Sequence, residues 1–420
     1  MTTTSTTPLV IRMLARTVGR PYFPLAFVGR LPFAMMIVGV LTVTTIEQGS
    51  LGLAGLLAAC AGLGTALVGP LSGALADRWG QRRVLLVLGL ASAAAATAFL
   101  LLVQVDTPPV ALVASATLLG ATTPQVAPFS RARLVGAAGT VPKDARERAS
   151  TLVMSYESMA DEASFVLGPV FVGLVSAVVA PWAPLALSVA LSVTVVPLFA
   201  VHPSSRWVSA SAEGTPANGA GATSGPRAIT PLRALVTPTL AVLVLAMLAV
   251  GGIFGATLTG LTGLLEELGA VEQTGLLYGA MSVGAIAMAL AVAALPAGVT
   301  LGQRWLASAV LSVLGLGGLL LSENLVLTGV ALFVSGCGVG ASLVALFSLG
   351  AIAAPHDRTN TVLVTLQSSL VVGQALVTAA SGALVESAHA SVAFALGSGL
   401  ALALVVLAVA YALLRRRAER

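Results

Sequence analysis

Residues 84–104 read "VLLVLGLASAAAATAFLLLVQ" and contain no charged side chain. An α-helix of about 20 residues crosses the roughly 30 Å hydrocarbon core of a bilayer and satisfies its own backbone hydrogen bonds there. Similar apolar segments recur along the whole chain of 420 residues, so the sequence predicts an all-α polytopic membrane protein. We expect twelve transmembrane helices, near residues 23–45, 51–72, 84–104, 109–129, 151–180, 184–201, 235–258, 275–297, 304–322, 325–353, 361–385 and 390–413.

The composition excludes a water-soluble fold. Hydrophobic residues make up 57% of the chain and charged residues only 9%, whereas a soluble domain has about 25% charged residues. The sequence also lacks the short alternating segments that are typical of transmembrane barrels. The first apolar segment is too long for a signal peptide and has no small-residue cleavage site, so we expect it to remain as a span.

The basic residues predict the orientation of the chain. The net charge is +5 and the isoelectric point is near 9.9. If both termini are cytoplasmic, all of the 21 Lys and Arg residues except Arg30 fall in alternate loops on the cytoplasmic side. The opposite loops carry only acids, such as Glu47, Asp106 and Glu386. This distribution follows the positive-inside rule, so we interpret the basicity as a topological signal of a multi-pass plasma-membrane protein and not as a sign of nucleic-acid binding.

The chain divides into two similar halves. Residues 202–234 include "SAEGTPANGAGATSGPRAITP", which predicts a flexible cytoplasmic linker between six-helix bundles at 1–201 and 235–420. The segment "AGLLAACAGLG" (54–64) resembles "TGLLYGAMSVG" (274–284), and a Gly-Gln-Arg follows each of them. Such repeats are typical of transporters whose substrate site lies between two bundles near the membrane midplane.

The loop between the second and third predicted spans reads "GPLSGALADRWGQRR", residues 69–83. It resembles the signature loop of the major facilitator superfamily, in which Gly, three residues, Asp-Arg, one residue and Gly precede basic residues. The matching positions are Gly73, Asp77, Arg78, Gly80, Arg82 and Arg83. The resemblance covers the whole chain and implies a twelve-span transporter in which this loop latches the two halves together on the cytoplasmic side in the outward-facing state. The alternative, a short basic topogenic loop, explains the arginines but not the acid and its glycines.

The chemistry of this loop suits a hinge. Its glycines allow a tight turn and close approach of helices. We expect Asp77 to lie beside the start of the third span, since a helix N-terminus favours negative charge. The corresponding place in the second half keeps Gly302 and Arg304 but has Val299 near the position of the acid, so the predicted latch is one-sided.

Two further spans bear on the direction of transport. In the fifth span, "LGPVFVG" contains Gly168, Pro169 and Gly173 and resembles a reduced form of the Gly-Pro motif of antiporters in this family. Ordinary small-residue helix packing is the alternative. Proton-coupled drug exporters of the family usually carry an Arg within the fourth span. Here that span has no basic residue until Arg131, which we expect at its cytoplasmic end, and this departure weakens an assignment as a standard exporter.

The fifth span also contains three acids, Glu157, Asp161 and Glu162. A central acid costs about 2.5–3.5 kcal/mol to insert and an apolar residue returns only about 0.3–0.6 kcal/mol, so three ionised acids cannot all face lipid. The spacing of Glu157, Asp161 and Ser164 places them on one helical stripe. Arg30 in the first span is the expected partner of these acids, unless it extends to the cytoplasmic surface. The acids then form either a proton or substrate site or a structural ion pair.

These features predict a secondary active transporter, efflux-type, that exports a small lipophilic, neutral or cationic organic compound in exchange for protons by alternating access. Proton-coupled uptake is the alternative, and a non-transporting receptor or assembly protein of the same fold is a third possibility. We expect a monomer in the lipid bilayer, with a small-molecule substrate and protons as its partners. No enzyme activity, cofactor or nucleic acid is expected. No metal site is expected either, because His202, His356 and His389 lack ligand spacing.

Overall fold

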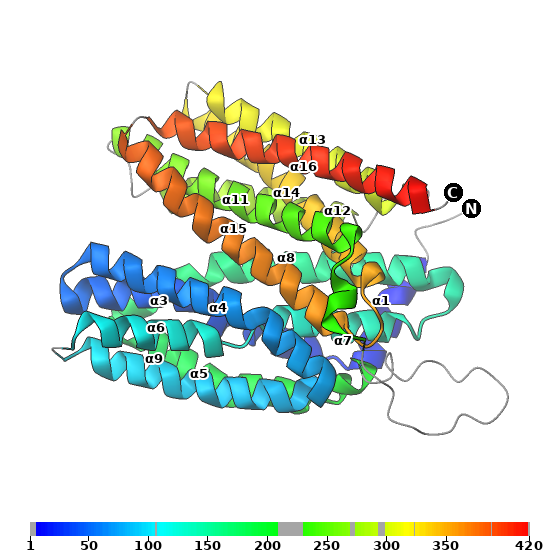
Figure 1. Ribbon diagram of the computed structural model, residues 1–420, viewed down its shortest axis with the longest axis horizontal. Helices are drawn as coiled ribbons and strands as arrows, with labels where there is room; N and C mark the ends of the chain where they lie inside the picture. Colours follow the sequence, from blue (N-terminus) through cyan, green and yellow to red (C-terminus); the bar gives the residue numbers. More distant parts are fainter. Residues whose placement is uncertain are drawn as a thin grey trace.

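The computed structural model describes residues 6–105, 107–208, 230–268, 274–292, 299–322, 324–387 and 389–418. These residues form helices joined by short connections, and no strand occurs among them. The N-terminal half consists of α1 (Thr6–Val18), α2 (Tyr22–Val28), α3 (Leu31–Gln48), α4 (Leu51–Trp79), α5 (Gln81–Val103), α6 (Pro109–Thr122), α7 (Val126–Ala138), α8 (Lys143–Val178) and α9 (Ala183–Val201). The C-terminal half consists of α11 (Pro238–Glu267), α12 (Thr274–Val292), α13 (Leu301–Leu320), α14 (Leu325–Ala353), α15 (Thr359–Ser387) and α16 (Ala390–Ala418). Figure 1 shows the two halves as two groups of roughly parallel helices, one above the other.

Eleven helices of the described residues are long and apolar enough to cross a membrane, which confirms an all-α polytopic membrane protein. The first of them runs from Tyr22 to Gln48 and comprises α2 and α3, which are separated by a turn at Gly29 and Arg30. The predicted eighth span corresponds to α12, whose apolar part, Leu277–Val292, is shorter than the others. The expected end of this span, at residues 293–297, lies outside the described residues, so the count of twelve stays a prediction.

The fourth span is broken into two helices and is longer than predicted. Helix α6 ends at Thr122 and α7 begins at Val126. Thr123 adopts an extended conformation because the ring of Pro124 disfavours a helical residue before it. The span nevertheless continues to Ala138 instead of ending near residue 129.

Within each half, glycines allow neighbouring helices to touch. A Cβ atom at Gly120 of α6 would lie 1.8 Å from the carbonyl oxygen of Ala61 in α4. In the C-terminal half, a Cβ atom at Gly251 of α11 would lie 1.9 Å from the carbonyl oxygen of Leu370 in α15. Such contacts replace the hydrophobic effect as the main source of helix association in lipid.

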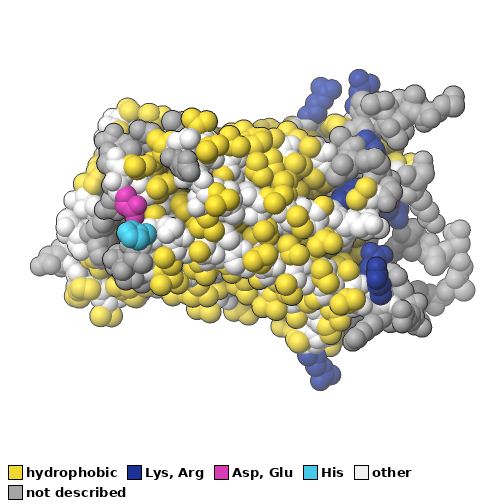
Figure 2. Space-filling model, turned by 90° about the horizontal axis from the view of Figure 1, so that it is seen from above, with side chains coloured by type: hydrophobic (Ala, Val, Ile, Leu, Met, Phe, Trp, Pro, Cys, Tyr) yellow, Lys and Arg dark blue, Asp and Glu magenta, His cyan; other side chains and the backbone are white. Residues whose placement is uncertain are grey.

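The charged side chains on the face seen in Figure 2 lie at the two ends of the molecule, with an apolar band between them. Lys and Arg gather at one end, and the acids and histidine at the other. The exposed Arg82, Arg83 and Arg206 mark what we call the basic end. The exposed Glu267 and His389, whose Oε1 and Nδ1 atoms lie 3.8 Å apart, mark the acidic end.

The predicted linker, residues 202–234, is described only at its two ends. Pro203–Ser205 and Leu232–Leu235 form short 3-10 helices. Near the second of these, Thr230 donates hydrogen bonds from its backbone nitrogen and its hydroxyl to Asp357, at 2.6 and 2.9 Å. Partial burial by itself would raise the pKa of the Asp357 carboxyl, but these hydrogen bonds outweigh that effect and the pKa is lowered. The predicted flexibility of residues 209–229 lies outside the described residues.

Candidate functional site

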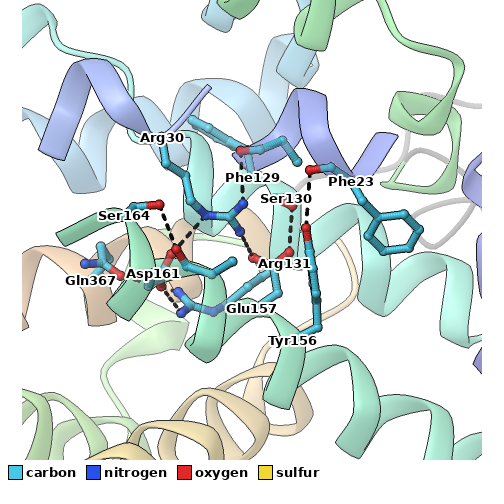
Figure 3. Close-up of polar contacts among 12 residues, drawn as sticks. Phe23, Arg30, Phe129, Ser130, Arg131, Tyr156, Glu157, Asp161, Ser164 and Gln367 are labelled. Atoms are coloured by element: carbon cyan, nitrogen blue, oxygen red, sulfur yellow. Dashed lines mark hydrogen bonds and ion pairs between the residues drawn. The ribbon is translucent and has the colours of Figure 1, made fainter. Parts of the chain in front are cut away.

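The acids of α8 are buried and two of them bind Arg30, as the sequence predicts. Arg30 lies between α2 and α3, and its Nε donates to Oδ1 of Asp161 at 3.0 Å. Its Nη2 donates to Oε2 of Glu157, whose other oxygen accepts a hydrogen bond from Ser130 Oγ at 2.7 Å. Figure 3 shows these side chains pointing toward one another from three helices. Because the guanidinium is only 3% exposed, Arg30 does not extend to the membrane surface.

Arg131 is the main residue of this site that sequence reasoning placed wrongly. It lies inside the fourth span, on α7, and is only 1% exposed. Its Nη2 donates to Oδ2 of Asp161, and its Nη1 donates to Oε1 of Gln367 at 3.3 Å (Figure 3). The guanidinium also lies over the ring of Phe347, 3.4 Å from its centroid. The fourth span therefore does contain a buried Arg. The expectation from the sequence, that this span departs from the exporter pattern, is wrong.

We call Glu157, Asp161 and Glu162 together with Arg30 and Arg131 the charged cluster. Two of its carboxylates face two guanidiniums, so these four charges balance. Glu162 is also buried, but no hydrogen bond or ion pair of its side chain occurs within the described residues. It lies on the side of α8 that packs against α12, where it interacts electrostatically with Tyr278 of the C-terminal half. The third carboxylate of the cluster is thus buried at the contact between halves, without a counter-ion among the described residues.

A small, partly open pocket borders the charged cluster. Its volume of about 20 Å³ is enough for a water molecule. Arg30, Asp161 and the amide side chains of Gln125 and Gln367 form its polar wall. The Oε1 atom of Gln125 is buried and has no hydrogen-bond partner in the part of the chain described, so it offers an acceptor to a molecule in this pocket.

The signature loop connects the two halves at the basic end. The carboxylate of Asp77, at the end of α4, accepts hydrogen bonds from the backbone nitrogens of Asn360 and Thr361, at 3.1 and 2.7 Å. It also accepts bonds from the side-chain nitrogen of Asn360, at 2.7 Å, and from the hydroxyl of Thr361. We call these contacts the interhalf latch. Asp77 does sit at a helix N-terminus, but at that of α15 and not, as expected, at that of the third span.

The loop glycines have distinct structural roles. A Cβ atom at Gly73 would lie 2.8 Å from the carbonyl oxygen of Asn360, so this glycine lets α4 approach α15. Gly80, between α4 and α5, has a φ of +86°, a conformation that favours glycine. The side chains of Arg78, Arg82 and Arg83 are exposed. In Figure 1, α4 and α15 meet at the basic end and diverge toward the other end.

The remaining predicted positions are spread over the molecule. A Cβ atom at Gly168 would lie 2.8 Å from Cβ of Ala34 in α3, whereas one at Gly173 would meet nothing within 4 Å. Pro169 lies inside α8, which continues past it. The imidazole of His202 is tilted against the ring of Tyr22, with ring centroids 5.7 Å apart, and partial burial together with the nearby Arg133 lowers its pKa. Within the described residues, no group of three His, Cys, Asp or Glu side chains could hold a metal ion.

Two helical halves that are joined at one end, with a buried charged cluster among the spans of the N-terminal half, define a polytopic membrane transport protein. The chain belongs to the Major Facilitator Superfamily, whose family model matches residues 22–366. This confirms the family that the signature loop indicates. No curated relative matches the chain by sequence.

Solved transporters share this fold at low sequence identity. The human organic anion transporter MFSD10 (TETRAN) is 18% identical, with a TM-score of 0.69 over 94% of this chain and 99% of that chain. A bacterial homologue of the iron transporter ferroportin, in the outward-facing state with soaked iron, is 14% identical, with a TM-score of 0.72 over 93% of this chain and 98% of that chain. The fucose:proton symporter of E. coli is 14% identical, with a TM-score of 0.64 over 92% and 98% of the two chains. These similarities show the fold.

Proposed function

We propose that this protein is a proton-coupled secondary transporter of the plasma membrane that exports a small lipophilic, neutral or cationic organic compound. The observation that carries the proposal is Glu162, a buried carboxylate for which the described part of the chain supplies no counter-ion, beside the balanced pairs of the charged cluster. Ionisable groups inside a membrane protein are expensive and are retained mainly where they have a function. Glu162 and Asp161 are the proposed coupling acids, and Arg30 and Arg131 hold Asp161 in place.

The buried Arg131 supports export over uptake. Family exporters that are driven by protons usually carry such an Arg in the fourth span, and here it binds an acid of the fifth span directly. An arginine held by a carboxylate responds to the protonation of that carboxylate, because the loss of the negative charge removes most of the attraction. This arrangement can therefore translate proton binding into a movement between α7 and α8.

The positions of the basic residues and of the latch support a conformational assignment. We place the basic end and both termini in the cytoplasm, following the positive-inside rule. With the interhalf latch formed there, the chain is closed on the cytoplasmic side. Alternating access then requires the contacts of Asp77 with Asn360 and Thr361 to break when the protein opens inward.

Transport into inverted membrane vesicles under an imposed pH gradient tests the proposal, with ethidium as a first fluorescent probe of lipophilic cations. We expect gradient-driven accumulation in the wild type and its loss when Asp161→Asn and Glu162→Gln are combined. Glu267→Gln, at the exposed acidic end, is the matched control and should transport normally. If the double variant still accumulates the probe in response to the gradient, the acids do not couple protons.

Uptake by symport is the competing direction, and the same vesicles distinguish it. A symporter would move its substrate in the same direction as the protons, whereas an antiporter moves it in the opposite direction. Because only molecules that bind the native state raise its thermal stability, a thermal-shift screen of neutral, cationic and anionic compounds identifies the substrate class. Stabilisation by anions alone would contradict the proposed substrate.

A further inference from the structure

Arg133 is a second buried guanidinium of α7, and its partners within the described residues are neutral. Its Nε donates to Oε1 of Gln81 at 2.7 Å, and its Nη1 donates to the carbonyl oxygen of Phe199 at 2.6 Å and to Ser204 Oγ at 3.1 Å. The side chain is 0% exposed, and the guanidinium stacks on the ring of Phe199, 3.9 Å from its centroid. A buried cation without a carboxylate is costly. We therefore expect Arg133 to have a role through the groups that it binds.

What Arg133 holds is the side chain of Gln81, the first residue of α5. The Gln81 Nε2 atom donates to Oδ1 of Asn360 at 2.5 Å and to the carbonyl oxygen of Phe129 at 3.2 Å. Asn360 in turn donates to Asp77. Since Arg133 is a donor only, it can bind only the oxygen of the Gln81 amide, and the amide nitrogen must then point to Asn360. The bond from Gln81 to Asn360 is therefore a further hydrogen bond between the halves, next to the interhalf latch.

The same short helix also contacts the charged cluster. Two residues before Arg133, Arg131 binds Asp161, Gln367 and Phe347. Positions two residues apart point about 200° apart around a helix, so the two arginines reach opposite sides of α7. Helix α7 has only 13 residues and is separated from α6 by the non-helical residues 123–125. It is thus a discrete unit between the charged cluster and the latch.

We propose that α7 couples the charged cluster to the interhalf latch, with Arg131 responding to the charge of Asp161 and Arg133 positioning Gln81 on Asn360. Besides Arg131, the charged groups facing Asp161 are Arg30, Glu157 and Glu162. When Asp161 becomes neutral, Arg131 loses its ion pair and α7 is released from α8. Arg133 then leaves Gln81, whose amide no longer points to Asn360, and the halves separate at the basic end. The inference rests on the proposed function in one respect only: it takes a transported proton as the agent that neutralises Asp161.

A double-mutant cycle on the distance between the halves tests this coupling. Spin labels are placed at Arg83→Cys and His356→Cys, two exposed positions in opposite halves, in a chain with Cys60→Ala and Cys337→Ala. Electron–electron resonance in lipid nanodiscs then gives the ratio of closed to separated molecules. Gln81→Glu keeps an acceptor for Arg133 but loses the donor to Asn360. One lost hydrogen bond of about 0.5–1.5 kcal/mol lowers this ratio roughly twofold to tenfold.

The decisive result is the effect of Asp161→Asn in the two backgrounds. We expect it to lower the closed-to-separated ratio when Gln81 is present and to have no further effect in the Gln81→Glu chain. If the two effects multiply instead, the sites are independent and α7 does not couple them. Gln81→Leu is the second variant: it removes all three hydrogen bonds of the amide and should lower the ratio at least as much. An unchanged ratio in both Gln81 variants would also overturn the proposal, whereas absent proton transport with an intact cycle would contradict only the proposed function.

Discussion

Replacing Asp77 with Ala removes four hydrogen bonds between the N-terminal half and the start of α15. Each hydrogen bond contributes about 0.5–1.5 kcal/mol net. Because Asn360 and Thr361 regain water when the halves separate, we use the lower part of the sum, about 2–4 kcal/mol. At 1.4 kcal/mol for each factor of ten, the ratio of closed to separated molecules falls about 30-fold to 700-fold.

Hydrogen–deuterium exchange measures this shift directly. The amides of Asn360 and Thr361 donate to Asp77, so in Asp77→Ala, where they also lose their acceptor, their protection falls by at least the same factor as the closed-to-separated ratio. Asp77→Asn keeps one side-chain oxygen as an acceptor and should give an intermediate loss of protection. Peptides at the acidic end, near Glu267, serve as the internal reference and should not change. Protection of the α15 start within threefold of wild type in Asp77→Ala would refute the reasoning.

Three further changes test the packing and charges described above. Arg131→Met leaves Asp161 with one ion pair fewer in a buried site and should lower the free energy of unfolding by about 3–5 kcal/mol, seen as a lower Tm in detergent. Gly168→Val places side-chain atoms against Ala34, less than 3 Å away for Cβ alone, and should cost about 1–3 kcal/mol, whereas Gly173→Ala, in open space, should leave Tm unchanged. His202 has a lowered pKa, so the unfolded chain binds more protons below about pH 6.5 than the native chain. The wild type should therefore lose more stability between pH 7.5 and 5.5 than His202→Asn does, and an equal loss in both chains would contradict this assignment.

The carboxylates and Arg30 could be predicted from the sequence because the evidence for them is local. Helical spacing places Glu157 and Asp161 on one stripe, and the cost of burying acids in a bilayer requires a cation nearby. Arg30 is the one cation within the predicted spans. The structure confirms both ion pairs.

Arg131 was misplaced because hydropathy ends a span where charges begin. The segment after Pro124 contains Ser130, Arg131 and Arg133, and the positive-inside rule assigns such residues to a loop. In the structure the span continues as α7, since the polar side chains face protein and not lipid. A signal was present nonetheless: the acids of the fifth span outnumber the single cation that was assigned to them.

The partner of Asp77 could not be found by the same means. Asn360 lies 283 residues away in the sequence, and neither composition nor periodicity relates the two positions. A helix N-terminus does favour an acid such as Asp77, but several helices begin at the basic end. Only the three-dimensional arrangement of α4 and α15 decides which of them receives the acid.

The order in which the charged cluster is synthesised has a consequence for biogenesis. Among the residues that the structure describes, every side chain that Glu157 or Asp161 binds, namely Arg30, Ser130 and Arg131, precedes them in the chain. Two of the three costly charges of the fifth span, Glu157 and Asp161, can therefore be neutralised while the nascent chain leaves the ribosome, before any helix of the second half exists. Insertion of the N-terminal half is in this respect self-sufficient, and the C-terminal half is needed for the closed state.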